Sequence, residues 1–176
     1  MGKGDLSKLK VMVVDSSPNM RRLITSMLEA FGFAACVVAS DGAMALQLMQ
    51  TGKVDIAIVD WHMEPVDGLV FLQSVRKSKD SPNPFLPIII ATGDSTMSTI
   101  KAARDAGVSA FLAKPISAGT LKKRVMFLLN DKRKFIRTSG YCGPDRRFHV
   151  FDGFRSIDRR GKAADSPAKE NQKVRV

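Results

Sequence analysis

The chain has 176 residues, of which 44% are hydrophobic and 26% are charged, a composition typical of a soluble globular protein. No apolar run approaches the roughly 18 residues that a membrane-spanning helix needs, and residues 1–10 lack the apolar core of a secretory signal. Cys36 and Cys142, the two cysteines, form neither a disulfide framework nor a metal-ligand spacing. We therefore predict a cytoplasmic protein without a membrane span.

The charge is unevenly distributed. Residues 1–129 contain 15 Lys and Arg against 11 Asp and Glu, a net charge of +4. Residues 130–176 contain 13 against 6, a net charge of +7. This difference predicts an ordinary, slightly basic domain followed by a basic tail that needs an explanation of its own.

In residues 1–129, short apolar runs alternate with amphipathic segments. Lys10–Val14 is almost wholly apolar and rich in Val, as expected of a strand that is buried on both faces. Ser17 and Pro18 mark the start of a helix whose apolar residues recur at helical spacing up to Phe31. The same alternation predicts further strands at Phe33–Ala39, Ile56–Val59, Pro87–Ala91 and Ala110–Leu112, and further helices at Asp41–Gln50, Leu69–Val75, Thr96–Ala106 and Ser117–Leu129.

Five strands that alternate with five helices predict an α/β fold, a parallel sheet covered on both faces. In such a sheet the functional crevice lies at the carboxyl ends of the strands. Asp15 follows the first strand, Asp60 the third, Thr92 the fourth and Lys114 the fifth. We expect these four side chains to lie along one edge of the sheet.

This set of residues suits metal-assisted phosphoryl transfer. Two carboxylates can hold Mg²⁺, which prefers oxygen ligands and keeps several waters. A carboxylate beside the metal can also attack phosphorus and form an aspartyl phosphate. Lys114 and the hydroxyl of Thr92 would then stabilise the transferred group by charge and hydrogen bonding.

Four segments carry these residues in the order of a known family. They are Val11–Asp15, Asp60–Gly68, Ile90–Gly93 and Phe111–Pro115. Together they resemble the receiver domains of response regulators, the CheY-like family of two-component signalling, over residues 10–129. The resemblance implies a flavodoxin-like strand order, a phosphoacceptor at Asp60, and Mg²⁺ bound by Asp15, Asp60 and the backbone carbonyl of His62.

The same resemblance implies a switch. Thr92 would move toward the phosphoryl group and Phe111 would reorient, while a cis peptide would join Lys114 to Pro115. A histidine kinase would supply the phosphoryl group to Asp60.

Two residues depart from the family pattern. The family has two adjacent acids after the first strand, but here Ser16 follows Asp15. The neutral hydroxyl removes one negative charge from the metal site, so we expect weaker Mg²⁺ binding. Two outcomes for Asp60 stay open: phosphorylation is weakened or lost, or it is retained because a hydroxyl can still hold a metal-bound water. Glu64 stands where the family usually has proline.

The tail divides by composition. Residues 130–160 mix arginine with aromatic residues, whereas residues 161–176 have no aromatics and are predicted to be disordered. The tail lacks long apolar periodicity, so we expect neither a second independently folded domain nor specific DNA binding. We predict a receiver over 1–129, a ligand-binding tail over 130–160 and a disordered C-terminus over 161–176.

The centre of the tail, residues 137–147, carries groups that recognise guanine nucleotides. Arginine forms two hydrogen bonds with the guanine edge, and aspartate accepts from guanine donors. Tyrosine or arginine can stack on the base, and further arginines bind phosphates. Gly143 and Pro144 indicate a turn that would hold Asp145, Arg146 and Arg147 together. The alternative is a non-specific basic arm for nucleic acid or anionic membrane.

The spacing Tyr-x-Gly-Pro-Asp-Arg-Arg after a receiver resembles the Cle family of CheY-like regulators. That resemblance implies a tail that binds cyclic di-GMP through Arg137, Tyr141, Asp145, Arg146 and Arg147. It also implies control of the flagellar motor switch and recruitment to the flagellated pole. The alternative function is a conventional phosphorelay receiver with an incidental tail, and in neither case do we expect an enzyme.

Overall fold

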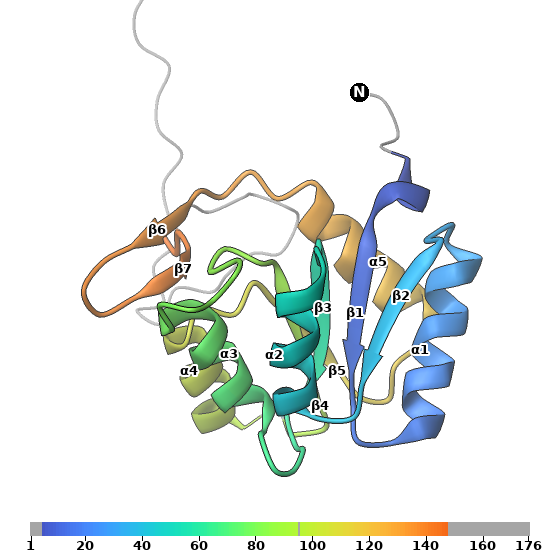
Figure 1. Cartoon of the computed structure of the whole chain (residues 1–176), viewed down its shortest axis with the longest axis horizontal. Helices are drawn as coiled ribbons and strands as arrows, with labels where there is room; N and C mark the ends of the chain where they lie inside the picture. Colours follow the sequence, from blue (N-terminus) through green and yellow to red (C-terminus); the bar gives the residue numbers. More distant parts are fainter. Residues whose placement is uncertain (1–4, 95, 148–176) are drawn as a thin grey trace, which may run out of the picture. The chain divides into compact units, whose positions relative to one another are not determined.

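The computed structural model describes residues 5–94 and 96–147 (Figure 1). The chain divides into two units, Met1–Arg146 and Arg147–Val176, and Arg147 is the only residue of the second unit that the structure describes. Residues 148–160 of the predicted ligand-binding tail, and the predicted disordered C-terminus at 161–176, lie outside the described residues.

The first unit contains a five-stranded parallel sheet with the strand order β2-β1-β3-β4-β5 (Figure 1). Its strands are β1 (Lys10–Val14), β2 (Ala35–Ala39), β3 (Ile56–Asp60), β4 (Ile88–Thr92) and β5 (Ala110–Ala113). A short 3-10 turn (Leu6–Lys8) precedes β1, and the helices are α1 (Pro18–Ala30), α2 (Gly42–Thr51), α3 (Gly68–Lys77), α4 (Met97–Asp105) and α5 (Ala118–Leu129). The predicted α/β receiver fold is confirmed.

The strands begin and end where the apolar pattern indicates, with one clear difference. Strand β2 begins at Ala35 rather than Phe33, because the Phe33 N–H donates to the Leu28 carbonyl at the end of α1 and the Phe33 side chain is buried in the apolar layer of α1 and α5. Polar side chains cap the helices as the sequence suggests. Ser17, for example, accepts a hydrogen bond from the backbone N–H of Met20 at the start of α1.

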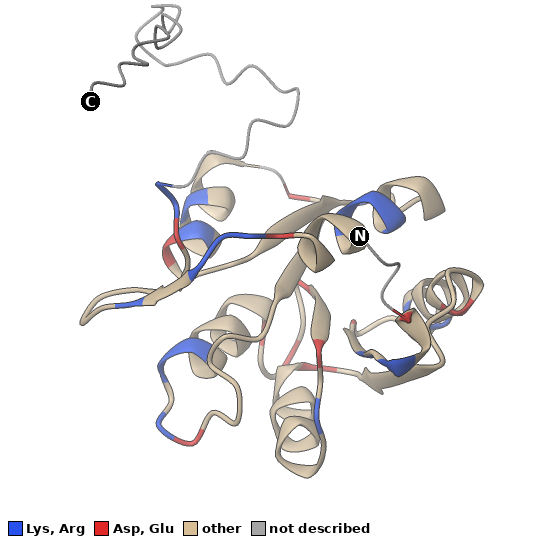
Figure 2. Cartoon of the chain, turned by 90° about the horizontal axis from the view of Figure 1, so that it is seen from above, with Lys and Arg blue, Asp and Glu red and all other residues tan. Residues whose placement is uncertain are grey.

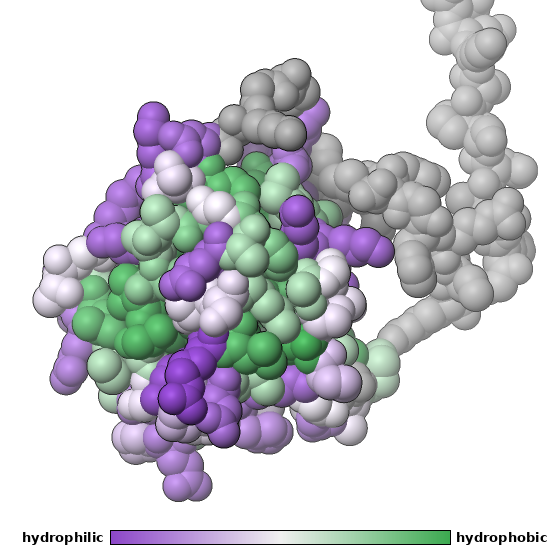
Figure 3. Space-filling view, turned by 90° about the vertical axis from the view of Figure 1, so that its right-hand side faces the viewer, coloured by the Kyte–Doolittle hydropathy of each residue, from purple (hydrophilic) through white to green (hydrophobic). Residues whose placement is uncertain are grey.

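Alternate residues of each strand feed two separate apolar layers. In β1, Met12 and Val14 pack with residues of α2 and α3, whereas Val11 and Val13 pack with residues of α1 and α5. Helices therefore cover both faces of the sheet, which explains why β1, β3 and β4 are almost continuously apolar. On the side of the molecule where α1 lies, apolar and hydrophilic surfaces alternate (Figure 3).

After α5 the chain forms a small antiparallel sheet of β6 (Phe135–Arg137) and β7 (Cys142–Pro144). The prediction of a turn at Gly143 and Pro144 is wrong, because both residues lie in β7 and the chain reverses between Thr138 and Tyr141. Gly143 is needed there for packing, since a Cβ on it would lie 2.7 Å from the Cα of Gly107.

This β6–β7 hairpin packs against the loops that precede β4 and β5. The ring of Phe135 meets that of Phe85 edge to face, with the ring centroids 5.8 Å apart. The carbonyl of Cys142 approaches Gly107 so closely that a Cβ there would lie 1.9 Å from the oxygen. The hairpin therefore sits at the amino end of the sheet, opposite the edge where Asp60 ends β3 (Figure 1).

Arg76 connects the hairpin to both of these loops. Its side chain is buried, and its guanidinium donates to the carbonyls of Gly107 at 3.0 Å and Pro84 at 2.8 Å. The same guanidinium lies 5.1 Å from the ring centroid of Phe135. Burial lowers the pKa of Arg76 to about 10, so the side chain remains charged at neutral pH.

Candidate functional site

The carboxyl edge of the sheet brings two acids and one lysine together. Lys114 Nζ lies 2.9 Å from Asp15 Oδ2 and 2.9 Å from Asp60 Oδ1. Both aspartates are buried, with 2% and 8% of their surface exposed. The structure therefore places three of the four predicted residues in direct contact, although Lys114 is 99 residues away from Asp15 in sequence.

The charges of this cluster are mutually dependent. Burial opposes the charged form of Lys114, but its hydrogen bonds to Asp15 and Asp60 outweigh that effect and raise the pKa of the ammonium. Lys114 therefore stays cationic between the two carboxylates, which would otherwise repel each other in a buried site.

Local backbone contacts position the two acids. Asp15 Oδ1 accepts a hydrogen bond from the Ser17 N–H at 2.8 Å, which ties the carboxylate to the first turn of α1. Asp60 ends β3, and its carbonyl lies so close to Gly68 that a Cβ there would be 2.3 Å away. The loop after β3 is thus folded back tightly on Asp60.

Thr92 ends β4 and faces the start of α4. Its hydroxyl donates to the carbonyl of Asp94 at 3.0 Å and accepts from the N–H of Asp94 at 2.9 Å. Asp94 Oδ2 in turn accepts from the hydroxyl of Thr99 in α4. Phe111, the predicted switch residue, is partly buried in β5 and packs against the apolar layer of α2, α3 and α4.

The donor set at this edge is suited to Mg²⁺ but is small. Asp15 and Asp60 supply carboxylate oxygens, which is enough for a cation that keeps several waters. Ser16 is exposed, and the adjacent backbone carbonyls of Asp15 and Ser16 are bound by the Arg21 guanidinium. Among the described residues, no group of three or more Asp, Glu, His or Cys side chains forms a metal cluster.

The peptide between Lys114 and Pro115 is cis, as the resemblance implies, and so is the peptide between Glu64 and Pro65.

The structure places Tyr141 and Arg146, both predicted tail residues, in contact with each other. The guanidinium of Arg146 lies 4.1 Å from the ring centroid of Tyr141, a cation–π stack. The hydroxyl of Tyr141 donates to the carbonyl of Pro144 at 2.9 Å. Arg137 is exposed at the end of β6, where it pairs in register with Cys142. Asp145 is partly buried after β7, and Arg147 is exposed.

Sequence reasoning missed the residues that anchor the hairpin. Arg76 lies one turn after Leu72 and next to Val75, on the buried face of α3, so helical periodicity was a usable signal. Arg133 forms an ion pair with Asp131 and donates to the Ser109 carbonyl at 2.9 Å. Nothing in the sequence indicates that pairing.

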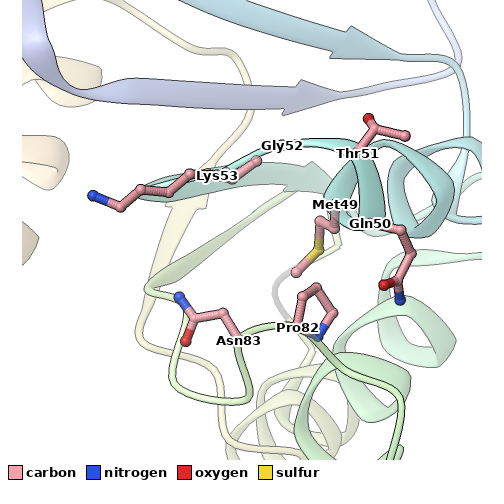
Figure 4. Close-up of a pocket in the computed structure, with 8 residues that line it drawn as sticks. Met49, Gln50, Thr51, Gly52, Lys53, Pro82 and Asn83 are labelled. Atoms are coloured by element: carbon pink, nitrogen blue, oxygen red, sulfur yellow. The ribbon is translucent and has the colours of Figure 1, made fainter.

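A pocket of about 500 Å³ lies near the amino ends of β3 and β4, away from the acidic cluster (Figure 4). The side chains of Met49 and Pro82 face each other across it, whereas Lys53 points away. Lys53 forms an ion pair with Asp55, and Gln50 donates to the Asp80 carbonyl, so both polar groups already have partners.

These observations define an α/β protein of the doubly wound type with a two-carboxylate, one-lysine site at the carboxyl edge of its sheet. A family model for the response regulator receiver domain matches residues 11–126. The chain belongs to this receiver family.

Chemotaxis proteins are among its relatives. The chain is 32% identical over 117 residues to the chemotaxis protein CheY of Pseudomonas aeruginosa, a match that covers 66% of this chain and 93% of that protein. The solved structure of Vibrio cholerae CheY4 aligns with a TM-score of 0.60 at 29% identity, covering 65% of this chain and 93% of that one. The receiver domain of the Francisella response regulator 1452 aligns with a TM-score of 0.61 at 31% identity, covering 69% and 96%.

Within residues 5–94 and 96–147, no helix is long and apolar enough to cross a membrane.

Proposed function

We propose that this protein is a phosphorylatable receiver in which Asp60 accepts a phosphoryl group from a histidine kinase. The observation that carries the proposal is the contact of Lys114 with both Asp15 and Asp60, at 2.9 Å each. An ammonium fixed beside a buried carboxylate is positioned to neutralise charge that develops on a transferred phosphoryl group.

In the reaction, a carboxylate oxygen of Asp60 attacks phosphorus, and the bond between phosphorus and the donor nitrogen breaks. The donor imidazole leaves with that electron pair. Lys114 binds the transferred group, and the Thr92 hydroxyl supplies a hydrogen bond after it turns from Asp94. Mg²⁺, when bound by Asp15, Asp60 and the carbonyl of His62, would neutralise further charge on the phosphoryl oxygens.

Incubation with acetyl phosphate and Mg²⁺, followed by intact-protein mass spectrometry, tests this function. We expect a gain of one phosphoryl group that is lost in Asp60→Asn and strongly reduced in Lys114→Ala. Asp67→Asn, which changes a partly buried acid that caps α3 and can still cap it as asparagine, is the matched control and should be phosphorylated normally. Equal labelling of Asp60→Asn would refute the assignment.

We propose a second function for the hairpin, the binding of cyclic di-GMP. The specific observation in its favour is the stack of Arg146 on Tyr141. An aromatic ring behind the guanidinium limits its rotation and keeps its planar donors available for a phosphate or a guanine edge. Arg137, Asp145 and Arg147 are the remaining proposed ligand residues, from the motif that the sequence contains.

The surrounding charge favours an anionic ligand. Residues 96–147 contain 12 Lys and Arg against 3 Asp and Glu, whereas residues 5–94 contain 8 against 10. Figure 2 shows the basic residues gathered on α5, on the segment that leads to β6, and around α4. We propose that the liganded protein acts on the flagellar motor switch, which is consistent with its chemotaxis relatives.

Calorimetric titration with cyclic di-GMP, with GTP as the comparison ligand, tests the second function. We expect saturable binding of cyclic di-GMP that persists at moderate salt and is lost in Arg146→Ala. Lys53→Ala, at the far pocket, is the control for lost positive charge. Equal binding of GTP, or affinity that collapses with salt, would instead support the non-specific arm.

A further inference from the structure

Two basic side chains from different parts of the fold converge on Asp105. Arg146 Nη1, from the segment after β7, lies 3.0 Å from Asp105 Oδ1. Lys101 Nζ, one turn earlier in α4, lies 4.0 Å from Asp105 Oδ2. A guanidinium and an ammonium therefore hold one carboxylate between them, as they would hold an oxygen anion of a ligand.

The carboxylate of Asp105 is easy to displace from this position. Asp105 is the last residue of α4, where the negative partial charge of the helix end opposes a carboxylate. The side chains of Asp105 and Arg146 are 54% and 38% exposed, so solvent screens the ion pair and it contributes little stability.

Arg146 keeps its place without Asp105. Its guanidinium stacks on Tyr141 at 4.1 Å, and Tyr141 is itself fixed by the hydrogen bond to Pro144. The hairpin also has contacts of its own that do not involve Asp105, since the Phe135 ring lies 5.1 Å from the Arg76 guanidinium and meets the Phe85 ring edge to face. An incoming phosphate can therefore replace the carboxylate and still meet an oriented guanidinium.

We propose that the Asp105 carboxylate stands where one phosphate of cyclic di-GMP binds, and that this phosphate replaces it between Arg146 and Lys101. The ligand site is then shared between the hairpin and α4. Lys101 becomes a binding residue that lies outside the tail motif, and Asp105 becomes an internal competitor that sets the affinity. This inference rests on the proposed binding of cyclic di-GMP.

Titrations of the full-length protein with cyclic di-GMP test the shared site. We expect Asp105→Asn to bind about three- to tenfold more tightly, because both the competitor and a repulsive charge are removed. Lys101→Ala should bind about three- to tenfold more weakly, and Lys123→Ala, which removes an exposed charge from α5, should change affinity less than twofold.

A double variant separates competition from a general charge effect. Because Arg146→Ala is expected to lose binding, the double variant that adds Asp105→Asn should not bind either, whereas a general charge effect would restore measurable binding. If the unmodified protein fails to bind cyclic di-GMP, both the proposed ligand and the proposed shared site are refuted. If it binds but Asp105→Asn binds equally or more weakly, only the shared site is overturned, and Asp105 instead positions Arg146.

Discussion

At the carboxyl end of the sheet the buried charges are two carboxylates that share one ammonium, whereas at the amino end the buried charge is a guanidinium that binds backbone carbonyls. The partners of Lys114 are Asp15 and Asp60, both ionisable. The partners of Arg76 are the carbonyls of Gly107 and Pro84 and the ring of Phe135, all neutral.

This difference separates a site that can exchange partners from one that is fixed by packing. One of the two contacts between the lysine and the acids can be exchanged. A metal ion can take the place of the ammonium beside a carboxylate, or a phosphoryl group can take the place of a carboxylate beside the ammonium, and no buried charge is then left unpaired. Arg76 has no such exchange, and its contacts only join α3, two loops and the hairpin. Helix α4 has contacts toward both ends of the sheet. Near its start Thr99 donates to Asp94, which follows Thr92, and at its end Asp105 pairs with Arg146 after the hairpin.

The largest effect is expected from Gly107→Ala. Gly107 has φ +89°, and a Cβ there would lie 1.9 Å from the Cys142 carbonyl, so the hairpin must move away. We expect the free energy of unfolding to fall by about 3 kcal/mol or more. Urea unfolding measures the loss, and limited proteolysis between β6 and β7 reports whether the hairpin has separated from the loops.

Gly32→Ala is a matched control for this substitution. Gly32 has φ +99°, which also disfavours a side chain, but no atom lies within 4 Å of the position of its Cβ. It should therefore lose only about 1 kcal/mol, the cost of the backbone conformation. Equal losses for the two variants would mean that the hairpin does not rest on Gly107.

A smaller loss is expected from Arg76→Ala. The substitution removes the guanidinium donor from the buried carbonyl of Gly107 and from the partly buried carbonyl of Pro84, and it removes the cation from the Phe135 ring. Lost hydrogen bonds and packing together should cost about 2 to 3 kcal/mol, measured by urea unfolding. Lys77→Ala, at the next and exposed position of α3, should change stability by less than about 0.5 kcal/mol. A loss below 1 kcal/mol in Arg76→Ala would show that the hairpin is held by other contacts.

The carboxyl edge could be predicted from sequence because parallel α/β topology is regular. Once Val11–Val14 and Ile56–Val59 are identified as buried strands, Asp15 and Asp60 must end at the same edge. The contact with Lys114 follows from the fifth strand in the same way. The alternation of strands and helices could not predict the orientation of the Thr92 hydroxyl, because that orientation depends on the backbone of Asp94 in the loop between β4 and α4.

The amino end could not be predicted in this way. The β6–β7 hairpin has strands of only three residues each, which is too short for an alternating apolar and polar pattern to be recognised in the sequence. Its docking depends on the missing Cβ of Gly107 and on the burial of Arg76, contacts that join residues 31 or more positions apart. Gly143 and Pro144 favour a turn by local propensity, but Gly143 packs against Gly107 and both residues pair with β6 in a strand.

The smallest effect is expected at the carboxyl edge of the sheet, next to the cluster of Asp15, Asp60 and Lys114. Ser16→Asp adds a carboxylate beside Asp15, at a position whose backbone carbonyl accepts from Arg21. We expect Mg²⁺ affinity to rise about tenfold, because an added negative charge a few ångströms from a divalent cation is worth on the order of 1 kcal/mol even in a solvated site. The single tryptophan, Trp61, directly follows Asp60, so its fluorescence during a Mg²⁺ titration reports binding.

Ser17→Asp is the control for this last change. Ser17 caps α1 through its side chain, and aspartate caps as well as serine, so the substitution adds the same charge one residue farther along without disturbing the helix. The gain in affinity should stay below about twofold, because the charge is directed to the N-terminus of α1 rather than to the metal site. A similar gain in both variants would mean that Ser16 limits Mg²⁺ binding only through the net charge of the loop, and that the serine has no specific place among the metal ligands.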